Sequence, residues 1–178
     1  MKHTDEQIAI FNCIATTDDH LIVKAGAGTG KTTTIVESAT LLPQGTKAAF
    51  LAFNKSIATE LAERLPTDVE AKTFHAFGFA AIRAAGVKTK VNGFKVNNII
   101  KDLLGADFYT APLKKLVSLI KGSLIEGNDR KAINRLIDEY NINFNSEREE
   151  LIAIQAIPSI LTMCRTQTHL IDFDDMIW

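Results

Sequence analysis

The stretch AGAGTGKTT, residues 25–33, constrains the fold more than any other part of the sequence. It follows a short apolar run at residues 21–23 and precedes a segment at 35–42 with apolar residues at helical spacing. Strand, glycine-rich turn and helix in this order are the context of a phosphate-binding loop. The glycines let successive backbone N–H groups point at an anion, and the helix adds the positive end of its dipole. The stretch therefore predicts an α/β fold that binds a nucleotide at this turn.

Each position of the loop has an expected role. Lys31 would reach the β- and γ-phosphates of ATP, the Thr32 hydroxyl would ligate Mg²⁺, and these two are the expected catalytic residues. Ala25 departs from the G-x-x-x-x-G-K-[ST] pattern, at a position that mainly makes the turn out of the strand. A dinucleotide loop is excluded because G-x-G-x-x-G would need glycine at position 31, whereas a plain glycine turn remains the simpler alternative. The expected nucleotide contacts are Ala25, Gly26, Ala27, Gly28, Thr29, Gly30, Lys31, Thr32 and Thr33.

Charge is distributed unevenly along a chain whose formal net charge is only −1. Residues 86–135 carry 10 Lys/Arg against 4 Asp/Glu, and residues 136–178 carry 2 against 8. A basic middle next to an acidic end indicates either a surface that faces a polyanion or an internal match of charges. Both interpretations stay open at the level of the sequence.

Composition excludes several classes of protein. An apolar content of 46% and a charged content of 23% are ordinary for a soluble globular protein. The two cysteines, Cys13 and Cys164, are far apart and form no C-x-x-C, which argues against a disulfide scaffold or a zinc site and fits a reducing cytosol. The start is polar, so no signal peptide is expected, and the apolar stretch 151–164 is too short to span a membrane.

Gln7 has two competing interpretations. The segment 4–15 has helical spacing, and Thr4 with Gln7 forms a T-x-x-Q capping box at its start. Alternatively, the carboxamide of Gln7 hydrogen-bonds an adenine, because it can donate and accept at once.

The order of the remaining patterns predicts a parallel RecA-like sheet built from residues 20–25, 48–53 and 69–72. Asn54 and Thr73 are each placed to cap the helix that follows a strand. From residue 87 to 167 only helical periods are visible, with no convincing strand. We therefore expect an α/β P-loop NTPase fold with a helical insertion: a core at 1–86, a helical subdomain at 87–170, and a return toward the core at 171–178.

These motifs also carry a family resemblance. Gln7, the loop at 25–33, AFNKSIATEL at 52–61 and KTFHAFG at 72–78 come in the order found in superfamily 1 DNA helicases of the UvrD/Rep type. AFNKSIA and KTFHAF are similar to the F-box DNA helicase branch and its phage relatives. The resemblance implies that the core is domain 1A with motifs Q, I, Ia and Ib, that the helical tract is a 1B-like insertion, and that the cell is bacterial or phage-infected.

The resemblance implies a role for each matching residue. Gln7 would read adenine, and Lys31 and Thr32 would hold phosphate and Mg²⁺. Single-stranded DNA, or a junction of single strand and duplex, would be lined by five residues: Phe53, Asn54, Lys55, Thr73 and His75. Many members have an aromatic residue two positions before the asparagine, where this chain has Ala52, so Phe53 has a core residue as its alternative interpretation.

The resemblance also implies machinery that lies outside the 178 residues. IDFDDMIW at 171–178 is similar to the segment shortly before the Walker B motif, and the acids Asp172, Asp174 and Asp175 read as the first turn of a last helix. The carboxyl-terminal helicase domains, with an arginine finger, would complete the site, so little ATP hydrolysis is expected of this chain alone. The alternatives are a small P-loop kinase using Arg130 and Arg135, and a nonenzymatic module that binds nucleotide or a partner through its basic helical region.

Overall fold

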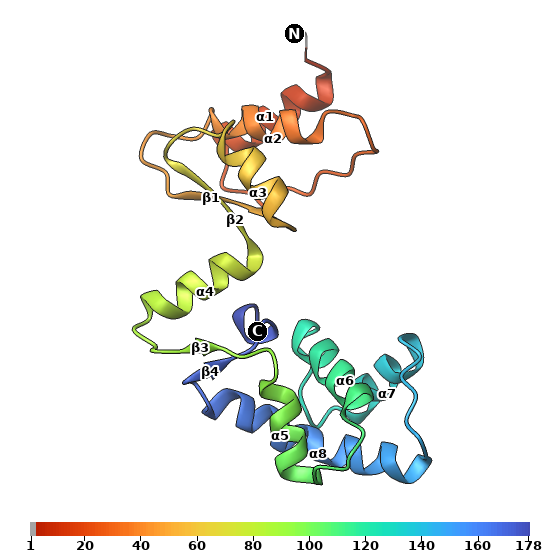
Figure 1. Ribbon diagram of the computed structural model, residues 1–178. Coiled ribbons are helices and arrows are strands. Elements are labelled where there is room, and N and C mark those ends of the chain that lie inside the picture. The colour runs from red at the N-terminus through yellow and green to blue at the C-terminus, as the bar shows by residue number, and fades with distance from the viewer. Residues whose placement is uncertain (1–2) are drawn as a thin grey trace. The chain divides into compact units, whose positions relative to one another are not determined.

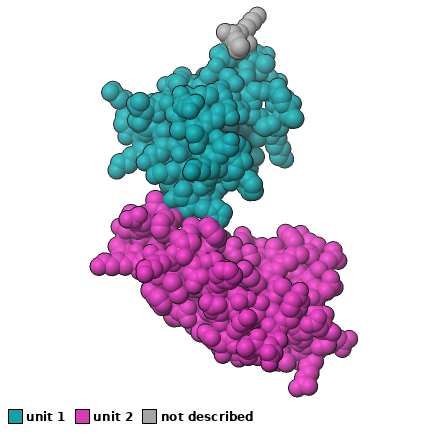
Figure 2. Space-filling view, in the orientation of Figure 1, with its two compact units in different colours: residues 1–77 teal, residues 78–178 magenta. Residues whose placement is uncertain are grey.

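The computed structural model describes residues 3–178 and divides the chain into two compact units (Figures 1 and 2). Unit 1 ends at Phe77 and unit 2 extends from Gly78 to Trp178. The division lies within helix α4, Phe74–Ala84, and therefore before the boundary at residue 86 that the sequence suggests. The assignment of residues 1–86 and 87–170 to a RecA-like core and a 1B-like subdomain stays a prediction.

Unit 1 is an α/β unit around a two-stranded parallel sheet. Strands β1 and β2 run in the same direction, with Ala48 opposite Val69 and Ala52 opposite Thr73. A parallel pair needs a crossover, and α3 provides it. The parallel arrangement predicted for these two strands is confirmed. The elements of the unit are α1 Asp5–Thr16, α2 Lys31–Ala39, β1 Ala48–Ala52, α3 Lys55–Ala62 and β2 Val69–Thr73.

The predicted strand at residues 20–25 is wrong. Residues 17–26 have no regular secondary structure, and Ile22 is 85% exposed. A strand exists only where a neighbour pairs with its N–H and C=O groups, and in the described chain β1 and β2 pair only with each other. The small core of this unit is formed by Ala52, Ala58, Leu61 and Leu65.

Unit 2 is built mainly from four helices around one apolar core. Helical periods in the sequence predicted these helices, and residues such as Ile100, Leu116 and Ile133 are fully buried between them. The expectation of no strand in this region is wrong, because β3 pairs in parallel with β4, and each strand is only two residues long. The elements are β3 Lys90–Val91, α5 Lys95–Leu104, α6 Thr110–Gly122, α7 Arg130–Glu139, α8 Glu147–Thr166, β4 Leu170–Ile171 and the 3-10 helix η1 Asp174–Met176.

Gly78 allows η1 to approach α4 closely. A Cβ atom at this position would overlap the backbone carbonyl oxygen of Met176. A side chain of any other residue would therefore displace the chain near η1. The expectation that the acids at 172–175 begin an α-helix is wrong, because only Asp174–Met176 are helical and they form a 3-10 turn.

Four buried charges connect the basic helices to the acidic end of the chain. Lys121 Nζ lies 3.0 Å from Asp172 Oδ2 and 2.7 Å from Asp175 Oδ1, and Lys95 Nζ lies 2.8 Å from Asp175 Oδ2. Lys95 also donates to the carbonyl oxygen of Cys164 at 2.7 Å. The two lysines are 2% and 1% exposed. The internal match of charges is confirmed for these residues, which we call the buried ion cluster (Lys95, Lys121, Asp172 and Asp175).

The buried ion cluster shifts the pKa values of two of its members. Burial alone would raise the pKa of Asp175, but hydrogen bonds from Lys121 and Lys95 outweigh it and hold that pKa below its ordinary value of 3.8. Burial alone would lower the pKa of Lys121, but the hydrogen bond to Asp175 and neighbouring negative charges raise it above 10.5. Both groups are thus charged, and both stabilise the folded unit, across the whole range between these values.

We predict that the stability of unit 2 falls at both ends of the pH scale. Asp175 stabilises the fold above pH 3.8 and loses this effect as pH falls through its lower folded-state pKa. Lys121 stabilises it below pH 10.5 and loses this effect as pH rises through its higher folded-state pKa. Urea unfolding can be followed by the fluorescence of Trp178, the single tryptophan of the chain, whose ring lies under Lys121 and Arg165.

Asp175→Asn is the control that shows how much of the acid-induced loss of stability comes from the Asp175 carboxylate. At pH 7 the substitution should cost about 3 kcal/mol, because one partner of a buried ionic group is lost. Below pH 3.8 the gap to the wild type should narrow. A gap that stays constant from pH 7 to pH 2.5 would contradict the lowered pKa.

Candidate functional site

The glycine-rich loop has the backbone geometry of an anion-binding turn. Gly28 and Gly30 have φ angles of 75° and 78°, in the left-handed region where glycine carries no steric cost. Gly30 is the N-cap of α2, so the helix begins at Lys31, and its first N–H groups have no partner within the helix. The Thr29 hydroxyl closes the loop by donating to the Gly26 carbonyl at 3.0 Å. This geometry forms although the segment before the loop is not a strand.

The Lys31 ammonium group lies over the loop. It donates to the carbonyl oxygens of Ala25, at 3.1 Å, and of Gly26. Both the loop and Lys31 are exposed, and Thr32 is an exposed residue of the first turn of α2. The positive charge is therefore held at the loop by two neutral carbonyls, which a phosphate oxygen can replace as a stronger, charged partner.

Gln7 links α1 to the helix that follows the loop. The capping box is confirmed, because Gln7 N–H donates to Thr4 Oγ1 at 3.3 Å and Thr4 N–H donates to Gln7 Oε1 at 3.0 Å. The Gln7 amide also donates to Thr34 Oγ1 at 3.0 Å, and Thr34 in turn donates to the Gly30 carbonyl at 3.1 Å. The contact with adenine stays a prediction.

Thr34 is a residue of this site that the sequence reasoning missed. It is 6% exposed and connects Gln7 to the residue that caps α2. It follows Gly30 by four residues, the spacing at which a helical threonine bonds to a preceding carbonyl. That spacing could have identified it.

Both predicted helix caps at the ends of the strands are confirmed. Asn54 follows β1 by two residues, and its Oδ1 accepts from the N–H of Ile57 at 2.9 Å. Thr73 is the last residue of β2, and its Oγ1 accepts from the N–H of Ala76 at 3.1 Å. Because the strands are parallel and Ala52 lies opposite Thr73, the residues that follow both strands come together at one edge of the sheet.

This edge carries a cavity and an exposed aromatic ring. Lys55, Lys72 and Thr73 line one cavity of about 380 Å³. Phe53 is 90% exposed, so its interpretation as a core residue is wrong. His75, in the first turn of α4, is also exposed. The edge thus offers a ring, the exposed cation of Lys55 and polar side chains, which are the kinds of group that bind a single strand of nucleic acid.

Phe74 and Phe77, both on α4, are not core residues of unit 1. They are 49% and 44% exposed, and neither belongs to the apolar cluster around Leu61.

Neither a preformed metal centre nor a membrane-spanning helix occurs among residues 3–178. No group of three or more His, Cys, Asp or Glu side chains in this range is arranged to hold a metal ion. No helix in the same range combines the length and the apolar character required to cross a bilayer.

Comparison with known proteins places this site in a family. Residues 7–174 match the family described as "AAA domain". F-box DNA helicase protein 1 of Schizosaccharomyces pombe (strain 972 / ATCC 24843) is 31% identical over 138 residues, which cover 75% of this chain and 16% of that protein. No solved structure matches the chain. With its phosphate-binding loop and the motifs of residues 7–78, the chain belongs to the AAA domain family, in the helicase-type branch that includes UvrD and Rep.

Proposed function

We propose that this chain is the ATP-binding, amino-terminal part of an ATP-dependent superfamily 1 DNA helicase. The observation that carries the proposal is the loop geometry: two left-handed glycines, a helix that begins at Lys31, and the ammonium group held over the loop. Family membership supports the same activity. In the whole protein, a second RecA-like domain supplies the other wall of the ATP cleft, and residues 87–170 form a 1B-like insertion.

The nucleotide is bound through groups that the loop already presents. The phosphates accept from the free N–H groups at the start of α2, and Lys31 exchanges the carbonyls of Ala25 and Gly26 for phosphate oxygens. The exposed Thr32 hydroxyl fits a Mg²⁺ ligand, and this ion neutralises charge on the phosphates when it is bound. Gln7 uses one amide N–H and one lone pair in its present bonds, which leaves one of each for adenine.

Single-stranded DNA is bound at the carboxyl-terminal edge of the sheet. The exposed ring of Phe53 stacks on a base, and Lys55 contacts a phosphate. Asn54 and Thr73 use their side-chain oxygens as acceptors in the helix caps, so their amide and hydroxyl hydrogens remain as donors to phosphate. His75 is a third polar contact. In the whole helicase, the coupling of this edge to ATP drives movement along the strand.

We predict that Lys31→Ala weakens the binding of Mg-ATP by about 10-fold to 100-fold in calorimetry. A hydrogen bond to a charged group contributes about 1.5–3 kcal/mol, which corresponds to that range. Lys24→Ala is the matched control, because it removes an exposed lysine one residue before the loop. Equal affinity of wild type and Lys31→Ala would refute the nucleotide site.

We predict that three substitutions at the sheet edge change oligothymidine binding in three different ways. One removes a charge, one removes a ring that stacks on a base, and one keeps a helix cap but adds a negative charge. In fluorescence anisotropy at low salt, Lys55→Ala should reduce the slope of log K against log salt by about 0.7. Phe53→Ala should cost about 1–3 kcal/mol of binding with an unchanged slope. Asn54→Asp keeps a capping oxygen but repels phosphate, so it should lose DNA binding while thermal stability is retained. Binding that none of these substitutions affects would remove the DNA site from unit 1.

We predict little or no DNA-stimulated ATP hydrolysis by these 178 residues alone. Asp175 is committed to Lys95 and Lys121 and is therefore unsuited to activate water. Electrostatic groups of the kind expected from the remaining domains contribute factors of about 10³–10⁵ in related phosphoryl transfers. Rapid turnover in a phosphate-release assay, abolished by Asp174→Asn, would show that an acid of the 172–175 tract is catalytic.

A further inference from the structure

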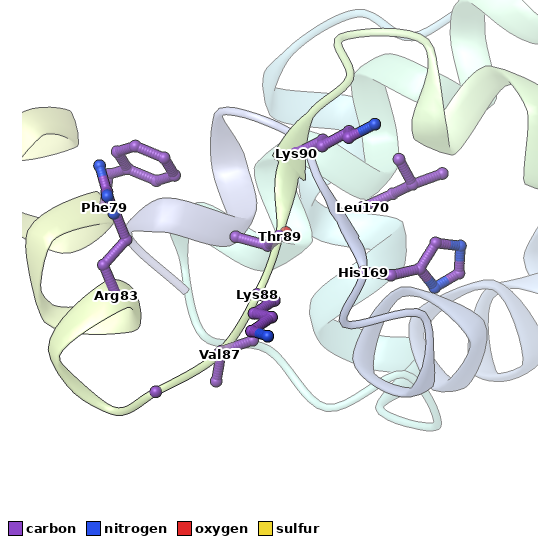
Figure 3. Close-up of a pocket in the computed structure, with 9 residues that line it drawn as sticks. Phe79, Arg83, Val87, Lys88, Thr89, Lys90, His169 and Leu170 are labelled. Carbon is purple, nitrogen blue, oxygen red and sulfur yellow. The ribbon is translucent and has the colours of Figure 1, made fainter.

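A second basic site lies in unit 2 and includes no residue of the helicase motifs. A cavity of about 730 Å³ is bounded by the end of α4, by the segment 86–90 that contains the start of β3, and by the residues that enter β4 (Figure 3). Its wall carries four nitrogen-bearing side chains: Arg83, Lys88, Lys90 and His169. No aspartate or glutamate lines it. The cavity is therefore a positively charged hollow.

The three cations of the wall, Arg83, Lys88 and Lys90, are not neutralised within the described residues, since none of them takes part in an ion pair there. The contrast with the buried ion cluster in the same unit is direct: Lys95 and Lys121 are paired with Asp172 and Asp175. Two of the three acids at the end of the chain, Asp172 and Asp175, are thus committed to other lysines. The exposed cations around the cavity repel one another, and an anion in the cavity would relieve that repulsion.

The spread of the charges favours a chain of phosphates over a single one. Figure 3 shows Phe79 and Arg83 on one side of the segment 87–90, and His169 and Leu170 on the other. Lys88 and Lys90 extend from the segment itself in different directions (Figure 3). A compact anion would be held by donors that converge on one point. Separated cations along an open hollow match the repeated charges of a polymer backbone.

Two further groups of the wall are consistent with this ligand. The guanidinium carbon of Arg83 lies 5.9 Å from the centre of the Phe79 ring, so the cation is held in place before any ligand binds. The Thr89 hydroxyl oxygen is buried and has no hydrogen-bond partner in the described part of the chain. An unpaired buried hydroxyl costs about 1–3 kcal/mol, so a movement of the segment 86–90 that brought this hydroxyl to an acceptor oxygen of a ligand would relieve the cost.

We propose that this hollow, which we call the unit 2 pocket, binds the phosphodiester backbone of single-stranded nucleic acid. Arg83, Lys88 and Lys90 are its phosphate contacts. The choice of nucleic acid as the polymer rests on the proposed function, whereas the choice of a polyanion rests on the pocket alone. A flexible single strand can enter a hollow of this size, but the phosphates of a rigid duplex follow a convex surface.

The test compares two triple substitutions of equal charge in the full chain. The pocket variant is Arg83→Gln, Lys88→Gln and Lys90→Gln. The control replaces three exposed lysines of unit 2 outside the pocket, Lys101, Lys114 and Lys131, by glutamine. The binding of labelled oligothymidine is measured by anisotropy across a series of salt concentrations, and Trp178 fluorescence verifies the fold. The pocket variant should lower the slope of log K against log salt by about 2, since each lost phosphate contact contributes about 0.7, and the control should change it little.

Several outcomes overturn the inference. An equal loss of oligothymidine affinity and of salt slope in both triple variants would show that only the net charge of the chain matters. Tighter binding of a duplex than of a single strand of the same length would exclude the proposed ligand. A pocket variant that binds like the wild type, while Phe53→Ala and Lys55→Ala weaken binding, would remove the pocket and leave the proposed function intact. If the pocket variant weakens binding while Phe53→Ala and Lys55→Ala do not, the pocket is supported and the DNA site in unit 1 is excluded.

Discussion

The parallel pairing of β1 with β2 is the constraint on which the candidate site of unit 1 depends. Two parallel strands end at the same edge, so the residues that follow them are brought together although they are about twenty positions apart in the sequence. Each strand also leads directly into a helix, whose first turn needs a cap. Asn54 and Thr73 supply these caps and are thereby fixed in position at the edge. The same backbone geometry therefore creates the need for polar residues and places them where a ligand of an open α/β sheet binds.

In unit 2 the cations of the basic tract divide into buried, paired members and exposed, unpaired members. The acidic end folds back onto the basic helices, and its carboxylates neutralise the two lysines that are buried. The lysines and the arginine around the unit 2 pocket remain unpaired in the described chain. Internal charge matching accounts for Lys95 and Lys121, whereas Lys88 and Lys90 of the same basic tract are left unpaired in the described chain and form part of the surface that we propose faces a polyanion.

Local signals in the sequence predicted more of the structure than long-range signals did. The capping box of Thr4 and Gln7, the caps Asn54 and Thr73, and the helices of unit 2 depend on residues within one turn or one helix face, so the sequence contains all that is needed to find them. The strand expected at 20–25 failed because a strand requires a partner that local sequence cannot supply. The pairing of β3 with β4 was missed because two residues show no period.

The candidate site was predicted only in part, because some of its features depend on local sequence and others on long-range packing. Loop geometry at Gly28 and Gly30 follows from residue type, whereas the exposure of Phe53 depends on what packs beside it and could not be read from its neighbours in the sequence. Thr34 had only a weak local signal. The partners of Lys95 and Lys121 lie more than fifty positions away, so the charge pattern indicated that pairing occurs but not which residues pair.

The burial of two lysines among many exposed ones has a practical consequence for chemical labelling. Acylating reagents modify lysine only as an accessible amine, and Lys95 and Lys121 are both enclosed and paired with aspartates. Their modification in a mass-spectrometric time course therefore marks molecules in which unit 2 has opened. Lys88 and Lys90 are exposed in the folded chain and react at once. One labelling experiment therefore reports two things in the same sample. Lys95 and Lys121 report whether unit 2 is folded, and Lys88 and Lys90 report whether a ligand covers its surface.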